Sequence, residues 1–313
     1  MRGVSCVVRQ SLCYLLSHQY HRLRRTWDFY QRESGLPSYS RRGDFDSPLP
    51  DICEGQRFAT GTLNHNPANE IPGIDLRVDG QQRLLLKMVE LYPEFDWLEH
   101  PIPGRRFHFG QAWYAQADSI CLYSMLRLFR PRRVVEIGSG FTSALMLDVN
   151  DRFLGGQTQL TFVDPYPSRL DLLLSRDDKR QIRLVRQRVQ DAPPTIFTEL
   201  ENGDFLFIDS SHVSKVGSDV NFLIFEVLPT LPVGVFVHFH DVFWPFEYPA
   251  KWIADGRSWN EAYLLRGFLT FNESFQIAFW VPFAALRWCD IIKECMPTYL
   301  TDTGAAIWIR RMR

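Results

Sequence analysis

Short β-branched and aromatic runs alternate with helical segments after Pro131, and this alternation constrains the fold of the chain most strongly. The pattern is typical of a parallel sheet whose crossover helices cover both faces. The first five predicted strands are 133–137, 160–164, 182–186, 205–209 and 235–240. A helix over 260–270 then precedes strands at 275–280 and 305–310, which suggest an antiparallel pair at the sheet edge. We therefore predict an α/β fold: a Rossmann-like, mostly parallel seven-stranded sheet with an antiparallel C-terminal edge strand.

The segment before this sheet has a different character. Residues 34–69 are rich in Pro, Gly, Ser, Asn and Asp, which predicts an irregular arm. Apolar residues at helical spacing over 81–91 and 115–129 predict two helices. The predicted division of the chain is a basic, irregular arm, a helical cap and a Rossmann-like domain, over 1–70, 71–130 and 131–313.

The composition of the chain restricts the cellular compartments and the binding partners that are expected for it. The first 27 residues carry five arginines and no acid, as in an organellar transit peptide, but a basic surface helix has the same composition and is favoured. Six cysteines without a CxxC pair or zinc-type spacing predict reduced thiols and a cytoplasmic protein, and no apolar window predicts a membrane span. A net charge of −1 provides no global field for nucleic acid, so a small-molecule or glycan acceptor is expected. The sequence does not predict an oligomeric state.

A glycine turn follows the first predicted strand in VVEIGSGFTS, residues 134–143. Gly138 and Gly140 allow a tight turn and close approach of a ligand, and the following helix start offers free N–H groups. A dinucleotide fingerprint would place a third glycine at Ser143, which weakens an NAD interpretation.

VVEIGSG resembles motif I of class I S-adenosylmethionine-dependent methyltransferases. The resemblance implies that Glu136 and the loop of Gly138, Ser139 and Gly140 bind the methionine part of the cofactor. It further implies that Asp164, at the end of the second strand, binds the ribose hydroxyls, although Asp164 would also suit a strand-end turn. Asp191 occupies the place of an adenine contact, and Asp-Ala-Pro is equally an ordinary helix cap.

Four further segments narrow the resemblance: FIDSSH at 207–212, HFHD at 238–241, PFEYP at 245–249 and WNEAYLLRGFL at 259–269. Together they resemble a bacterial methyltransferase group of the Methyltransf_24 type, over roughly Ile71 to the C-terminus. The implied activity is S-adenosylmethionine-dependent methylation, with O-methylation of a small-molecule or sugar hydroxyl expected.

Methyl transfer to a hydroxyl needs the acceptor held in line and deprotonated, and two arrangements could supply this. His212 could act as general base next to Asp209, since a neutral imidazole accepts a proton near pH 6.5. Alternatively Asp209, His240 and Asp241, at two adjacent strand ends, could bind one divalent cation that lowers the pKa of the acceptor. A mixed set of His and carboxylate ligands suits manganese, iron or zinc.

Other interpretations of these residues stay open at this point. His238, His240 and Asp241 resemble part of a two-His-one-carboxylate iron site, which predicts a metal-dependent oxygenase as the alternative enzyme. A non-catalytic cofactor-binding module is the third alternative. His212 could be structural, and Glu247 and Tyr248 could only shape a lid loop. Trp244 is expected in the core more often than in a substrate platform, although it lies where an acceptor could stack.

Overall fold

The computed structural model describes residues 40–65 and 70–313. The chain divides into two compact units, Met1–Glu54 and Gly55–Arg313. All site residues predicted from the sequence belong to the second unit. The basic N-terminal segment, with Cys6 and Cys13, lies outside the described residues.

The second unit is built on a seven-stranded sheet with the order β3-β2-β1-β4-β5-β7-β6. The strands from β3 to β5 in this order pair in parallel, and β7 is antiparallel to both β5 and β6. β6 and β7 thus form the predicted antiparallel pair, with β7 inserted between β5 and β6. The strands are β1 Arg133–Ile137, β2 Gln159–Val163, β3 Arg183–Val185, β4 Phe205–Ile208, β5 Phe236–Phe239, β6 Phe275–Trp280 and β7 Ile307–Arg311.

Helices connect and cover these strands. The α-helices are α2 Ile52–His65, α3 Val78–Leu91, α4 Gln116–Phe129, α5 Phe141–Phe153, α6 Ser168–Leu173, α7 Asp178–Gln181, α8 Thr195–Thr198, α9 Asp219–Phe222, α10 Ala250–Ala254, α11 Glu261–Leu269, α12 Val281–Arg287 and α13 Cys289–Cys295. Short 3-10 helices span Tyr92–Glu94, Val189–Asp191, Leu228–Thr230 and Pro297–Leu300, and a π-helical turn spans Leu223–Val227.

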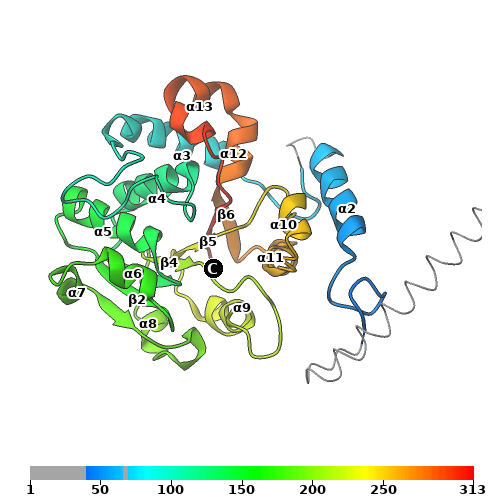
Figure 1. Ribbon diagram of the computed structural model, residues 1–313. Coiled ribbons are helices and arrows are strands. Elements are labelled where there is room, and N and C mark those ends of the chain that lie inside the picture. The colour runs from blue at the N-terminus through cyan, green and yellow to red at the C-terminus, as the bar shows by residue number, and fades with distance from the viewer. Residues whose placement is uncertain (1–39, 66–69) are drawn as a thin grey trace, which may run out of the picture. The chain divides into compact units, whose positions relative to one another are not determined.

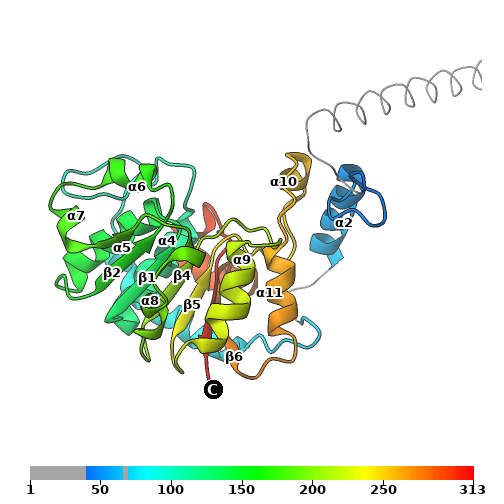
Figure 2. The ribbon, with the colours of Figure 1, turned by 90° about the horizontal axis from the view of Figure 1, so that it is seen from below.

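Layers of helix lie on both sides of the sheet (Figure 1). α4 contacts both α3 and α5, and α3 also contacts β6, so these helices form one layer with the sheet. α8 and α9 lie on the other side of the strands in the same view. Every residue of β4 and β5 is buried, as expected for central parallel strands covered on both faces. Figure 2 shows the strands side by side from below.

Two predictions about the N-terminal part have different outcomes. The irregular arm over 34–69 is wrong in part, because α2 occupies Ile52–His65. Asp51 caps this helix, since its carboxylate accepts a hydrogen bond of 2.9 Å from the backbone N–H of Glu54. The helices of the predicted cap are present as α3 and α4. The division into arm, cap and domain stays a prediction.

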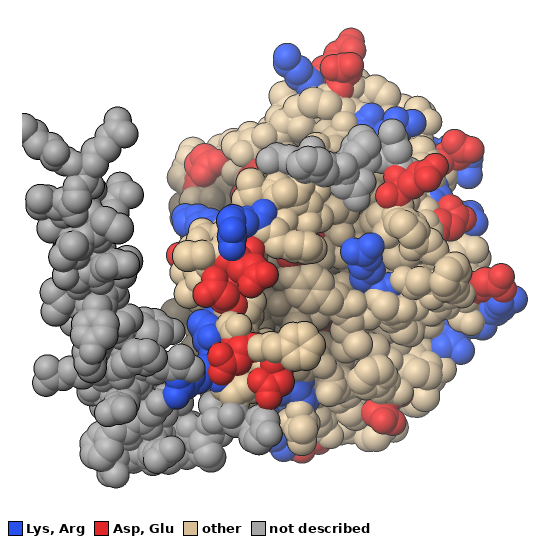
Figure 3. Space-filling model, turned by 90° about the vertical axis from the view of Figure 1, so that its right-hand side faces the viewer, with Lys and Arg blue, Asp and Glu red and all other residues tan. Residues whose placement is uncertain are grey.

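The described surface carries both signs of charge. On the face shown in Figure 3, basic and acidic side chains are interspersed. Within the described ranges, no helix is both long and apolar enough to cross a membrane. Among the described residues, Cys121, Cys289 and Cys295 are free thiols.

Candidate active site at the carboxyl ends of β1, β4 and β5

The predicted glycine loop connects β1 to α5. Gly138 has φ of 82°, in the left-handed region that favours glycine, and its N–H donates to the carbonyl of Val163 over 3.0 Å. A Cβ at Gly138 would lie only 2.3 Å from the carbonyl oxygen of Asp209. The glycine therefore lets the loop pass directly against the end of β4.

Glu136 holds the start of α5 and does not line the cavity. Its side chain is fully buried and accepts hydrogen bonds from the hydroxyls of Thr142 and Ser143. Ser143 Oγ also accepts from the N–H of Gly140 over 3.0 Å. Burial raises the pKa of Glu136 to about 8, and the two hydroxyl donors only partly offset this rise. Glu136 therefore positions the loop, and its direct contact with the cofactor stays a prediction.

Asp164 follows β2 and faces the glycine loop. Its carboxylate accepts hydrogen bonds from the N–H of Ser139 (3.0 Å), the hydroxyl of Ser139 (2.7 Å) and the N–H of Tyr166 (2.7 Å). Gly138, Ser139, Gly140 and Asp164 all line one cavity. Four of the predicted cofactor residues are thus brought together.

Asp191 is not brought to this cavity. It lies in a 3-10 turn, and its half-exposed carboxylate pairs with Arg188 at 2.7 Å. It is absent from the residues that line the cavity. Asp191 does not act as the alternative helix cap either, since the N-cap position of α8 is Pro194, and an adenine contact of Asp191 stays a prediction.

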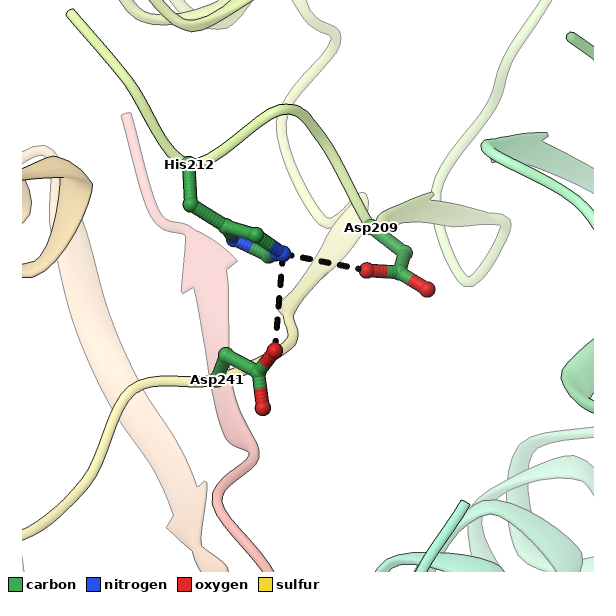
Figure 4. A group of neighbouring side chains, drawn as sticks. All are labelled: Asp209, His212 and Asp241. Atoms are coloured by element: carbon green, nitrogen blue, oxygen red, sulfur yellow. Dashed lines mark ion pairs between the residues drawn. The ribbon is translucent and has the colours of Figure 1, made fainter. Parts of the chain in front are cut away.

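Three potential metal ligands converge at the ends of β4 and β5 (Figure 4). His212 Nε2 lies 3.4 Å from Asp209 Oδ1 and 3.4 Å from Asp241 Oδ2. The three ligand atoms lie within 4.8 Å of one another. His212 and Asp241 both have φ near +60°, which costs a residue with a side chain about 1–3 kcal/mol and is most often found at functional sites.

Glu261, which was not predicted from the sequence, fixes the orientation of His212. Its carboxylate lies 2.9 Å from His212 Nδ1 and accepts from the hydroxyl of Ser210 over 2.8 Å. The ring also packs on Trp259, with 4.3 Å between centroids. Burial by itself lowers the pKa of His212, but hydrogen bonds with Asp209 and Glu261 raise it well above the usual value. The sequence analysis assumed an ordinary histidine pKa for His212, and the structure indicates a higher one.

His238 in β5 and His240 just after it differ from their predicted roles. His240 is buried, and its Nε2 lies 3.6 Å from Asp241 Oδ1, but it is not part of the three-atom group, where His212 takes its place. His238 is fully buried and stacks on Phe207 with 3.7 Å between centroids. Burial lowers its pKa well below the usual value. An iron site that uses His238 is therefore wrong, and the oxygenase alternative loses one of its ligands.

The cavity has a volume of about 600 Å³. Besides the glycine loop and the Asp209–His212–Asp241 cluster, its walls include Trp113, Trp252, Trp259, Arg169 and Arg257. Trp244 is buried against Trp280 and Phe283, which confirms the favoured core interpretation of this residue over the stacking of an acceptor.

Known proteins are similar to the part of the chain that contains this site. A family model described as a methyltransferase domain matches residues 135–242, from β1 to just beyond Asp241. An uncharacterized protein of Archaeoglobus fulgidus is 31% identical over 164 residues, which cover 51% of this chain and 72% of that protein. Residues 135–242 therefore form a class I S-adenosylmethionine-dependent methyltransferase domain. The matched span of this methyltransferase contains its glycine loop, Asp164 and the whole Asp209–His212–Asp241 cluster.

Solved structures of low sequence identity are also similar to this methyltransferase. The S-adenosylhomocysteine-bound Podospora anserina methyltransferase PaMTH1 is 13% identical, with 89% of this chain and 100% of that chain covered and a TM-score of 0.41. A methyltransferase from Geobacter sulfurreducens is 15% identical, with 78% and 100% covered and a TM-score of 0.38. The O-methyltransferase TomG from Streptomyces achromogenes is 12% identical, with 83% and 99% covered and a TM-score of 0.36.

Proposed function

We propose that this methyltransferase transfers the methyl group of S-adenosylmethionine to a hydroxyl oxygen of a small molecule or sugar, with the help of a divalent cation. One observation carries the proposal. Asp209, His212 and Asp241 place three ligand atoms within 4.8 Å of one another, in the cavity that the glycine loop also lines. The acceptor hydroxyl and the cation that activates it would therefore lie in the same cavity.

The residues around the cavity fit the cofactor. Gly138 and Gly140 leave the loop without side chains where the cavity begins, and the N-terminus of α5 follows at once. Asp164 offers a carboxylate that can accept both ribose hydroxyls. A volume of about 600 Å³ is within the range of small-molecule sites.

The cluster also fits a cation. Two carboxylates and one imidazole are a donor set that suits manganese, iron or zinc. Glu261 is bound to the opposite ring nitrogen of His212, as a carboxylate commonly is behind a metal-binding histidine. His212 in this role replaces the His240 of the sequence prediction, and His240 remains a neighbour of Asp241.

Each part of the site has a defined task in this proposal. S-adenosylmethionine would supply a methyl group bound to a positively charged sulfur; the acceptor oxygen would form the new bond to the methyl carbon, and the electron pair of the broken S–C bond would stay on the sulfur. Asp209, His212 and Asp241 would hold a cation that lowers the pKa of the acceptor hydroxyl, so that its proton is released to solvent. The glycine loop and Asp164 would fix the cofactor so that the hydroxyl oxygen is in line.

Cofactor binding is the first test. Calorimetric titration should show binding of S-adenosylmethionine and S-adenosylhomocysteine, and no binding of NAD, which serves as the control. Absence of binding for both sulfur compounds would overturn the assignment of this cavity.

The metal is tested separately. Metal analysis after dialysis against manganese, magnesium, iron or zinc should find about one bound ion, and Asp241→Asn should lose it. Asp290→Asn provides a matched control, since Asp290 lies in α13 outside the cluster. S-adenosylhomocysteine should still bind after treatment with EDTA. A protein that holds no stoichiometric ion would leave His212 as the activating group, and His212→Ala should then lower turnover by ~10² to 10⁴ while EDTA has no effect.

A further inference from the structure

Two arginines in the cavity wall form no ion pair with a carboxylate of the described residues. Arg169 and Arg257 both line the cavity, and neither has a side-chain hydrogen bond to a carboxylate in this part of the chain. Both guanidinium groups instead lie over tryptophan rings. A cation in this state keeps its hydrogen-bond donors free for a ligand.

The loop between α10 and α11 fixes the place of Arg257. Gly256 has φ of 81° and ends α10, and the N–H of Arg257 donates back to the carbonyl of Trp252 over 3.0 Å. The guanidinium carbon lies 4.2 Å from the centroid of the Trp252 ring and 5.0 Å from that of Trp259. Two aromatic faces therefore hold one arginine without neutralising its charge.

The same loop connects Arg257 to the proposed metal cluster. Trp259 contacts both the guanidinium of Arg257 and the ring of His212, the latter at 4.3 Å between ring centroids. The backbone N–H groups of Asn260 and Glu261 donate to the carbonyl of His212 over 3.0 and 3.2 Å. A ligand bound to Arg257 would thus lie one tryptophan away from the group that activates the acceptor.

Arg169 belongs to a different part of the cavity. A Cβ at Gly140 would lie 3.1 Å from Arg169 Cδ, so this arginine lies against the glycine loop. Its guanidinium lies over Trp113, at 3.8 Å from the ring centroid. Arg169 is therefore on the cofactor side, whereas Arg257, which forms no ion pair within the described residues, lies in the α10–α11 loop.

We propose that Arg257, together with Trp252 and Trp259, binds an anionic group of the methyl acceptor. The acceptor is then a hydroxylated acid that carries a carboxylate or a phosphate, and its hydroxyl lies toward Asp209, His212 and Asp241. This inference rests on the proposed function and adds the chemical class of the substrate. The planar fork of arginine suits both oxygen anions, because it can donate two parallel hydrogen bonds to either.

Pairs of probes that differ only in the anionic group test this proposal. Binding is measured by calorimetry in the presence of S-adenosylhomocysteine and manganese, for catechol against 3,4-dihydroxybenzoate and for glucose against glucuronate and glucose 6-phosphate. The two sugar acids distinguish a carboxylate from a phosphate. In at least one set, we expect the anionic compound to bind ~10-fold or more tightly than its neutral partner, as a charge-assisted bidentate contact would give.

Variants then test whether Arg257 is the source of the preference for anionic probes. Arg257→Gln should remove the preference for the anion, with an unchanged thermal midpoint and unchanged binding of S-adenosylhomocysteine. Arg266→Gln is the matched control, since Arg266 is an exposed arginine of α11 outside the cavity wall. A parent protein without any preference for the anionic probes, or an Arg257→Gln variant that keeps the preference, would overturn the inference alone. A parent that fails to bind S-adenosylhomocysteine would overturn the proposed function as well.

Discussion

His212 Nδ1 lies 2.9 Å from a carboxylate oxygen of Glu261, and this contact turns Nε2 of the same ring toward Asp209 and Asp241. Glu261 is almost fully buried, so it has no competing contact with water. Its other oxygen accepts from Ser210, in the loop that leads from Asp209 to His212. The carboxylate therefore orients the imidazole and the loop that carries it, without itself reaching the cavity.

Glu261→Gln should weaken metal binding without affecting the cofactor. The amide can no longer act as a charged acceptor for Nδ1–H, and loss of such a partner behind a metal ligand typically costs ~10- to 100-fold in affinity. Titration with manganese, followed by calorimetry, measures this change. S-adenosylhomocysteine affinity is the internal control. Unchanged manganese affinity in the variant would show that Glu261 has only a structural role.

Asp164→Ala should weaken S-adenosylhomocysteine binding by roughly 10²- to 10⁴-fold, because it removes two charge-assisted hydrogen bonds to the ribose that contribute ~1.5–3 kcal/mol each. Asp164 also holds Ser139 of the glycine loop, which offers a second explanation for such a loss. Ser139→Ala separates the two, since it removes the hydroxyl contact and keeps the carboxylate. We expect the serine variant to bind nearly as tightly as the parent. Equal losses in both variants would mean that Asp164 acts through the loop alone.

Gly138→Ala should lower the midpoint of thermal unfolding, whereas Gly140→Ala should leave it nearly unchanged. At Gly138 the new Cβ would meet the backbone oxygen of Asp209 at 2.3 Å, and φ of 82° adds strain of ~1–3 kcal/mol. Thermal unfolding should therefore show a clear drop in the midpoint. At Gly140 the nearest atom belongs to the flexible Arg169 side chain, at 3.1 Å, so the midpoint should stay near that of the parent. Equal midpoints for the two variants would contradict the close approach of the loop to β4.

The sheet could be predicted from the sequence because its central strands are continuous apolar runs between polar or glycine boundaries. β1 and β6 have the predicted bounds, and Asp209 and Asp241 were found because strand ends meet at one edge. α2 was missed because its composition resembles a loop, although Asp51 and Glu54 are ordinary signals of a helix start.

The residues around His212 were harder to predict, because they come from distant positions in the chain. Glu261 is 49 positions from His212 and looks like any acid in the first turn of a helix. Its only signal was its place in the segment WNEAYLLRGFL. His238 and His240 share one face of β5 by alternation, yet His238 is stacked on Phe207 in the core. The spacing in the sequence could not show which of the two histidines lies near the site, because this depends on how deeply each side chain is buried.

Glu136 leads to a prediction about stability and pH. Its pKa is raised from 4.5 to about 8, so the folded protein holds a proton on this group that the unfolded chain releases above pH 4.5. The resulting contribution to stability is fully present at low pH and decreases as the pH rises from about 4.5 toward 8.

Glu136→Gln removes this dependence, because the amide resembles the protonated acid and does not titrate. The difference in unfolding free energy between the variant and the parent should increase in favour of the variant by a few kcal/mol across that interval, at ~1.4 kcal/mol for each unit of pKa shift. Urea unfolding at pH 5, 6, 7 and 8 measures it. Glu226→Gln is the control, since Glu226 is exposed. The unfolding free energy of this variant should change with pH in the same way as that of the parent. A Glu136→Gln curve that also runs parallel to the parent would mean that Glu136 is ionised in the folded protein, with Thr142 and Ser143 compensating its burial.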